Sequence, residues 1–235
     1  VISGAVILAG SFPEAPFGTW MAEALEATWR LNLSFPFLCA QALAPRMPEG
    51  SCLQVVLDTS IHRPWLQRLP YSAAKAGLAS LVPGLAQLLA PEVRVVGHAL
   101  GVLLPQEGSD AAWLGSRTLL NRIGDPADLC AATLLALGVD PPGSLPAQYI
   151  AGLRAAMGRF ASEGKRLVLC LDTGNISTDV ARQLLRVANL AGERGCQLNI
   201  VLMGPHPLHQ QLDVPALIQL RQRIGIRHRV RPLTL

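Results

Sequence analysis

Short apolar runs alternate with longer amphipathic stretches along most of the chain. Five of the short runs predict buried strands: residues 4–9, 52–57, 93–97, 166–171 and 197–203. The stretches between them read as helices, over about residues 20–44, 73–89, 147–163 and 178–194. Strands and helices that alternate in this way predict an α/β fold with a doubly wound parallel sheet. We expect about five strands in a three-layer αβα arrangement, with residues 52–57 as the central strand.

Two of the predicted helices contain residues that disfavour a regular helix. Pro36 lies inside residues 20–44, and Pro83-Gly84 lies inside residues 73–89. A prolyl ring removes one helical hydrogen bond and clashes with the preceding turn, and glycine weakens a helix interior. We therefore expect a bend near Pro36 and a kink near Pro83.

Tyr71 and Lys75 lie four residues apart at the start of one predicted helix, so they share a face. An ammonium beside a phenol favours the phenolate, so the pKa of Tyr71 should fall below its ordinary value of about 10. Such a phenol is a usable general acid for the oxygen of a carbonyl whose carbon gains hydride. On this pair alone, the other interpretation is an alanine-rich helix that happens to carry a tyrosine and a lysine.

The surroundings of this pair favour the chemical interpretation. Residues 52–60 are an apolar run that ends in polar residues, and the Tyr71 helix and a second strand follow. This order, with an asparagine-bearing helix at 29–38 and an Arg-Ile-Gly-Asp-Pro segment within 119–128, resembles the short-chain dehydrogenase/reductase family. The resemblance covers about residues 4–137 and implies a Rossmann-like fold. Within the family it is nearest to the pteridine reductases, through two segments, residues 61–64 and 104–108.

The resemblance assigns a catalytic tetrad to Asn32, Ser60, Tyr71 and Lys75. It implies that Tyr71 donates the proton and that Ser60 holds the carbonyl oxygen. Lys75 would bind ribose and lower the pKa of Tyr71, and Asn32 would anchor a proton-relaying water. The family usually places its serine, or the aspartate of pteridine reductases, about two residues further from the tyrosine than Ser60 lies. Either the loop is shorter here or Asp58 takes the role, and we favour Ser60 because it aligns with the end of the strand.

The resemblance also implies NADPH as cofactor, with Lys75, Gly101 and Val102 among the residues that contact it. Roughly the first 80 residues of a usual family member have no counterpart, and the chain contains no Gly-rich phosphate-binding turn. The family's Asn-Asn-Ala-Gly stretch appears here as Ile-Leu-Ala-Gly at residues 7–10. We therefore expect NADPH to bind weakly.

Residues 138–235 resemble a second family, the AAA-type ATPases of general secretion and transposition accessory functions. Four segments carry this likeness: residues 167–172, a Walker B-like strand, and residues 188–190, 200–204 and 220–224. Thr173 follows Asp172 where a catalytic glutamate should stand, and no phosphate-loop motif occurs in the chain. The Walker B motif is thus degenerate, and Asp172 fits a polar strand end better than a magnesium ligand.

The chain therefore divides into a reductase-like segment, residues 1–137, and a P-loop ATPase-like segment, residues 138–235. Each resembled family is built on a parallel sheet, and each lacks its N-terminal nucleotide-binding unit here. Two separate half-domains would leave long unpaired strand edges, which proteins avoid. We expect the two segments to share one composite sheet.

Composition and charge set limits on location and partners. The net charge of +4 comes mainly from C-terminal arginines, which fit a solvated face better than a nucleic-acid site. Five scattered cysteines fit a reduced, cytoplasmic protein. No apolar stretch approaches the roughly 20 residues that span a bilayer, and no signal peptide is recognisable. His206 and His209 lack further ligands nearby in sequence, so we expect no metal site.

Three functional hypotheses follow. The first is an NADPH-dependent oxidoreductase-like protein that reduces a small carbonyl or pterin-type substrate, impaired by the missing cofactor-binding half. The second is a non-catalytic α/β scaffold, recombined or designed, without a working nucleotide site. The third is a regulatory protein related to P-loop ATPases. A homo-oligomer is possible for the first, because many family members are tetramers.

Overall fold

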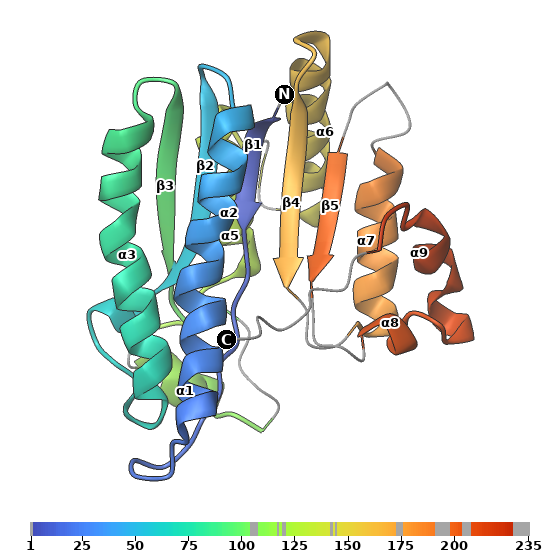
Figure 1. Ribbon diagram of the computed structural model, residues 1–235. Coiled ribbons are helices and arrows are strands. Elements are labelled where there is room, and N and C mark those ends of the chain that lie inside the picture. Colours follow the sequence, from blue (N-terminus) through green and yellow to red (C-terminus); the bar gives the residue numbers. More distant parts are fainter. Residues whose placement is uncertain are drawn as a thin grey trace.

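The five strands form one parallel sheet in the order β3-β2-β1-β4-β5 (Figure 1). Their bounds are Ile2–Ile7 for β1, Ser51–Asp58 for β2, Val93–Leu100 for β3, Arg166–Asp172 for β4 and Leu198–Met203 for β5. The computed structural model describes residues 2–103, 108–116, 118, 121–141, 143, 145–172, 176–190, 198–203 and 208–227. The predicted doubly wound α/β fold is confirmed.

β1 is the central strand, so the prediction that residues 52–57 are central is wrong. The chain moves outward from β1 to β2 and β3, then returns to the other edge of β1 to add β4 and β5. β1 pairs with β2 through Gly4 opposite Cys52 and with β4 through Gly4 opposite Leu167. The strands of residues 1–137 and of residues 138–235 therefore belong to one sheet. The division of the chain at residue 137 stays a prediction.

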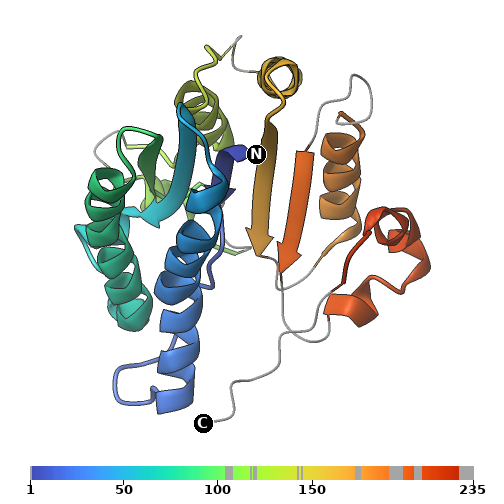
Figure 2. The ribbon, with the colours of Figure 1, turned by 45° about the horizontal axis from the view of Figure 1, so that its top comes forward.

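Helices cover both faces of the sheet (Figures 1 and 2). On one face lie α1 (Ala22–Trp29), α2 (Phe35–Leu43) and α3 (Leu69–Leu89). On the other lie α5 (Pro126–Ala136) and α6 (Pro146–Ser162). Beside β5 lie α7 (Thr178–Leu190), α8 (Leu208–Gln211) and α9 (Ile218–Arg223), and the short α4 spans Ala111–Ser116.

The predicted helix over residues 20–44 is interrupted just before its proline. α1 and α2 are joined by a π-helical turn, Arg30–Ser34, and the Phe35 N–H donates to the Arg30 carbonyl five residues back. Pro36 follows in the first turn of α2, and it has no N–H with which to continue an ordinary helix from the preceding turn. In contrast, α3 continues as one helix through Pro83.

Side chains alternate along the inner strands, so separate clusters of buried residues form on the two faces of the sheet. Val55 on β2 and Ile7 on β1 pack in one cluster with Leu78 of α3, whereas Gln54 reaches the other face, where its amide donates to the Thr133 carbonyl of α5. The second cluster contains Leu137, Ala156, Met157, Phe160 and Leu167. A third, with Ile176, Ala181, Leu184, Leu212, Leu217 and Leu220, joins α7 to the segment around α9. Within the described residues, no helix is both long and apolar enough to span a bilayer.

Because β1 joins both parts of the chain, we predict one cooperative unfolding transition. Leu53→Ala on β2 and Leu167→Ala on β4 each remove a buried side chain, so each should lower the free energy of unfolding by about 2–5 kcal/mol. The more exposed Leu38→Ala is the control, with an expected change within about 0.5 kcal/mol. Urea denaturation, monitored by hydrogen exchange of the backbone amides in β2 and β4, checks this prediction. Two transitions, each shifted by only one variant, would contradict it.

Candidate active site

Tyr71 and Lys75 lie on the first turns of α3, where Pro70 also occupies the first turn. Both side chains are buried, with 7% of Tyr71 and 4% of Lys75 exposed. The Lys75 Nζ lies 5.8 Å from the Tyr71 ring centroid and donates a hydrogen bond of 2.9 Å to the Val56 carbonyl of β2. The ammonium is thus held near the phenol ring and fixed to the sheet.

Asp58, the last residue of β2, contacts the Tyr71 hydroxyl. That hydroxyl donates to Asp58 Oδ2 at 3.0 Å, and the other carboxylate oxygen accepts from the Ser60 backbone N–H at 2.6 Å. The Ser60 hydroxyl is buried and has no hydrogen-bond partner among the described residues. The structure thus brings Asp58, and not the favoured Ser60, to the tyrosine. Asp58 lies 13 residues before Tyr71, about the spacing that the family resemblance implies.

The expectation that the pKa of Tyr71 falls is wrong. Burial raises the pKa of the Tyr71 phenol well above its ordinary range, and the Asp58 carboxylate raises it further by charge and by accepting its hydrogen bond. Arg68 opposes this weakly. Burial also lowers the pKa of Lys75 to about 8, against the opposing attraction of Asp58. Tyr71 is therefore a protonated phenol at neutral pH, beside a lysine that can lose its proton at mildly basic pH.

Asn32 lies in the π-helical turn between α1 and α2 and is fully buried. Its amide nitrogen donates to the carbonyls of Ser11 (3.1 Å) and Thr28 (3.0 Å), while its Oδ1 has no partner among the described residues. A Cβ placed on Gly10 would lie 3.0 Å from that Oδ1 and 3.6 Å from the Lys75 Nζ. Asn32 and Lys75 therefore converge on Gly10, and π-helical turns often occur at functional sites.

The carboxyl ends of β1 and β2 form the edge where open α/β sheets bind ligands. Tyr71, Lys75 and Asn32 converge there, whereas the Ser60 hydroxyl contacts none of them by hydrogen bond. Gly101 and Val102 directly follow β3, and the Val102 carbonyl accepts from the Gly124 N–H at 2.8 Å. The pteridine reductase-like segment at 104–108 lies mostly outside the described residues.

Sequence reasoning missed Phe12 and Arg68. The Phe12 ring packs edge-on against Tyr71, with 4.6 Å between centroids and 75° between planes. Arg68 lies immediately before α3, and its guanidinium stacks over the Phe12 ring at 3.9 Å. Loop residues have no periodicity from which these contacts could be predicted. The one available signal was the position of Arg68, three residues before Tyr71.

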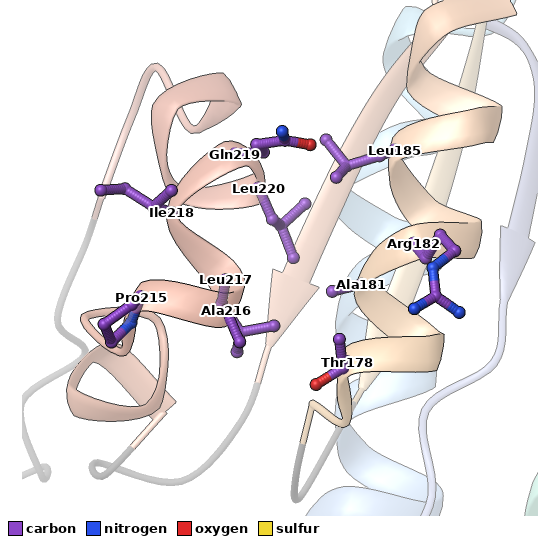
Figure 3. A pocket seen from close by; sticks show the side chains of 10 residues that line it. All are labelled: Thr178, Ala181, Arg182, Leu185, Pro215, Ala216, Leu217, Ile218, Gln219 and Leu220. Atoms are coloured by element: carbon purple, nitrogen blue, oxygen red, sulfur yellow. The ribbon is translucent and has the colours of Figure 1, made fainter.

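A separate pocket of about 260 Å³ lies between α7 and the segment that leads into α9 (Figure 3). Its lining is Thr178, Ala181, Arg182 and Leu185 on α7, and Pro215, Ala216, Leu217, Ile218, Gln219 and Leu220 opposite. None of the residues around Tyr71 takes part. Among the described residues of this lining, Arg182 is the one ionisable group, so they offer no acid–base pair comparable with Asp58 and Tyr71.

The metal-related predictions fall largely outside the described residues. His206 and the side chains of His209 and Asp172 are not described. Among the side chains that are described, no group of three or more His, Cys, Asp or Glu residues could hold a metal ion.

The model of the family described as short chain dehydrogenase matches residues 3–110. This part of the chain is short-chain dehydrogenase-like. Tropinone reductase-like 3 of Erythroxylum coca is 28% identical over 136 residues, which are 54% of this chain and 50% of that protein. The chain thus spans about half the length of this curated relative.

Solved structures agree with this assignment. A dehydrogenase/reductase from Sinorhizobium meliloti 1021 is 26% identical, with a TM-score of 0.52 over 57% of this chain and 55% of that one. The landomycin C-6 ketoreductase LanV, solved with bound NADP and rabelomycin, is 20% identical, with a TM-score of 0.51 over 64% of this chain and 57% of that one. The second likeness bears on the fold alone.

The lowered pKa of Lys75 predicts that stability rises between pH 8 and 10. In this window the unfolded chain binds the lysine proton and the folded protein has released it, so raising the pH favours folding. The expected gain is about 2 kcal/mol, before titration of Tyr71 in the unfolded chain offsets it. Urea denaturation of Lys75→Met should lack this gain, whereas Lys165→Met, at the other lysine, should keep it. An equal pH dependence in Lys75→Met and wild type would contradict the assignment.

Proposed function

We propose that the chain carries the acid–base site of a short-chain reductase, for a small carbonyl or pterin-type substrate. The contact between Tyr71 and Asp58, with Lys75 beside it, carries the proposal. In this role Tyr71 donates a proton to the oxygen or nitrogen of the C=O or C=N bond whose carbon gains hydride. Lys75 stabilises the phenolate left behind, because its ammonium lies near the ring. Asn32 would hold a water at its free Oδ1.

Asp58 favours the pterin-type substrate over a simple ketone. The resemblance to pteridine reductases implies an aspartate at this position, and here its carboxylate receives the tyrosine hydrogen bond. A carboxylate next to the phenol opposes formation of a phenolate, so an ionised Asp58 makes Tyr71 a weak acid. A weak acid passes its proton best to a substrate atom that is more basic than a ketone oxygen. The basic ring nitrogen of a reduced pterin accepts such a proton more readily than a ketone oxygen does.

NADPH, when bound, would supply the hydride, and only one end of it fits the residues present. Lys75 keeps two N–H groups beyond its bond to Val56 and could contact ribose, with Gly101 and Val102 at the adjacent edge of the sheet. The chain contains no Gly-rich turn for a pyrophosphate, and β4 occupies the side of β1 opposite β2. The nicotinamide end thus has partners among these residues, and the pyrophosphate lacks a Gly-rich turn.

A missing half cannot join the sheet at β1. A preceding βαβ unit would have to pair with an edge of β1, but β2 occupies one edge and β4 the other. Any further nucleotide contacts from this chain must therefore come from the segments around β4 and β5. The P-loop ATPase alternative depends on Asp172, whose side chain is not described, so the geometry gives it no support. The non-catalytic scaffold remains the second candidate, favoured by the missing phosphate-binding turn.

We predict that NADPH binds with a Kd near 1 mM, about 4 kcal/mol of binding free energy, because its pyrophosphate and adenosine lack their usual partners. NADPH fluorescence titration measures this. Turnover of a dihydropterin should be slow, and Tyr71→Phe should reduce it by about 100-fold or more. Asp58→Asn should reduce it as well, because Asp58 accepts the hydrogen bond that orients the Tyr71 hydroxyl. Ser60→Ala is the matched control, expected within about 3-fold of wild type, since the Ser60 hydroxyl makes no hydrogen bond to a described residue.

Other outcomes would separate the alternatives. Micromolar binding of NADPH would show that the residues of this chain bind the cofactor tightly without a Gly-rich turn. Turnover that depends on Ser60 and not on Asp58 would overturn the assigned role of Asp58. Measurable turnover that survives Tyr71→Phe would place the chemistry elsewhere, and absence of any turnover at saturating NADPH would favour the scaffold.

A further inference from the structure

Residues 10–19 lie in the connection between β1 and α1 (Figure 1), and their Phe12 side chain contacts the tyrosine of the candidate site. We call this segment the strap. Its Phe12 ring meets the Tyr71 ring edge-on at 4.6 Å, and the Phe12 ring also lies 6.2 Å from the Trp65 ring. Phe12 itself is 40% exposed, whereas Tyr71 beneath it is buried. Phe12 therefore forms part of a lid over the phenol.

Arg68 holds the strap in this position through three contacts. Its guanidinium stacks over the Phe12 ring, donates to the Phe12 carbonyl and pairs with the Glu14 carboxylate. Next to it, the Gln67 carbonyl accepts from the Ala15 N–H at 3.1 Å. The Arg68 side chain is nearly buried, but that of Glu14 is about half exposed. An ion pair with one exposed partner contributes little to stability, so this latch can break without unfolding the protein.

The strap is also fixed at its beginning. The Asn32 amide donates to the Ser11 carbonyl and, at 3.4 Å, to the Ser11 hydroxyl. Gly10 and Gly18 lie near the two ends of the strap. Gly18 has a φ of 93°, which other residues rarely adopt. Phe17, close to Gly18, is almost fully exposed. The strap is thus tied down over Tyr71, with backbone freedom at its two ends.

We propose that the strap is an autoinhibitory cover, latched by Arg68 and Glu14, that must lift before a substrate can contact Tyr71. Tyr71, Lys75, Ser60 and Asn32 are all at least nine-tenths buried in the latched arrangement. Only 7% of Tyr71 is exposed, so little of the phenol is open to a substrate in this arrangement. The proposal rests on the proposed function only in taking Tyr71 as the reacting group.

Nitration by tetranitromethane measures the cover without any substrate or cofactor. The chain has two tyrosines, so peptide mass spectrometry can follow Tyr71 and use Tyr149, on α6, as an internal reference. Arg68→Met should speed nitration of Tyr71 by about tenfold, since it removes the ion pair and the stacking contact together. Glu14→Gln, which removes the ion pair alone, should speed it about threefold. The controls are Arg63→Met and Glu23→Gln, at two exposed residues, and neither should change the nitration rate of Tyr71 or of Tyr149.

Charge effects do not imitate this result. Nitration proceeds through the phenolate, and Arg68 lowers the pKa of Tyr71. Loss of the arginine alone would keep the phenol protonated and slow the reaction. Faster nitration of Tyr71 in Arg68→Met therefore reports exposure.

An unchanged Tyr71 rate in Arg68→Met, with Tyr149 also unchanged, would overturn the proposal. If Arg68→Met speeds both tyrosines, the variant has unfolded, and Phe12→Ala and Glu14→Gln decide the matter. If Tyr71, but not Tyr149, is nitrated faster in both Phe12→Ala and Glu14→Gln, the cover is supported. If the nitration rate of Tyr71 is unchanged in both variants, the proposal is refuted. Because no turnover is measured, a cover shown in this way stands even if the reductase proposal fails, and the reverse also holds.

Discussion

β1 is hydrogen-bonded along both edges, to β2 on one side and to β4 on the other. Parallel strands need long crossover connections, so this double pairing requires the chain to leave β1, build β2 and β3, and return past the starting strand. Gly4 shows how closely the returning part packs, since a Cβ there would lie 2.7 Å from Leu137 and 2.9 Å from Leu167. The C-terminal strands are therefore integral to the sheet on which the short-chain dehydrogenase-like segment is built.

The same arrangement determines what the site has and what it lacks. The carboxyl ends of β1 and β2 place Gly10 and Asp58 side by side with the first turns of α3, which carry Tyr71 and Lys75. Acid–base groups are thereby assembled from the part of the chain that matches the family. The pyrophosphate end of a dinucleotide depends on the opposite side of the switch point, where β4 and β5 replace the strands of a usual member. Under the proposed function, acid–base geometry and cofactor affinity would therefore depend on different parts of the chain.

Most of the fold could be predicted from the sequence, because short apolar runs bounded by polar residues mark buried strands well. The strand order could not be predicted. β1 and β2 are both buried along nearly their whole length, and apolar character alone does not distinguish a central strand from its neighbour. Likewise, the spacing of Tyr71 and Lys75 identified a shared helix face correctly. It could not reveal that burial and Asp58 raise the pKa of the phenol.

The choice between Asp58 and Ser60 depended on local backbone geometry that the sequence does not show. Both are polar and follow the same apolar run, but the short helical turn Thr59–Ile61 directs the Ser60 N–H back to Asp58 and leaves the Asp58 carboxylate facing Tyr71. The strap was equally hidden, since its contacts come from a proline-containing loop without periodicity. Close contacts between loops and helix ends are thus where the sequence-based account of this site failed.

The titration of Tyr71 tests the account most directly. In a Tyr149→Phe background, Tyr71 is the remaining tyrosine, and its ionisation can be followed by ultraviolet absorbance. The account predicts that the phenolate appears well above pH 10, and that Asp58→Asn moves its pKa downward. Ionisation below pH 10 in the folded protein, unaffected by Asp58→Asn, would contradict the Asp58–Tyr71 contact on which the proposed site depends.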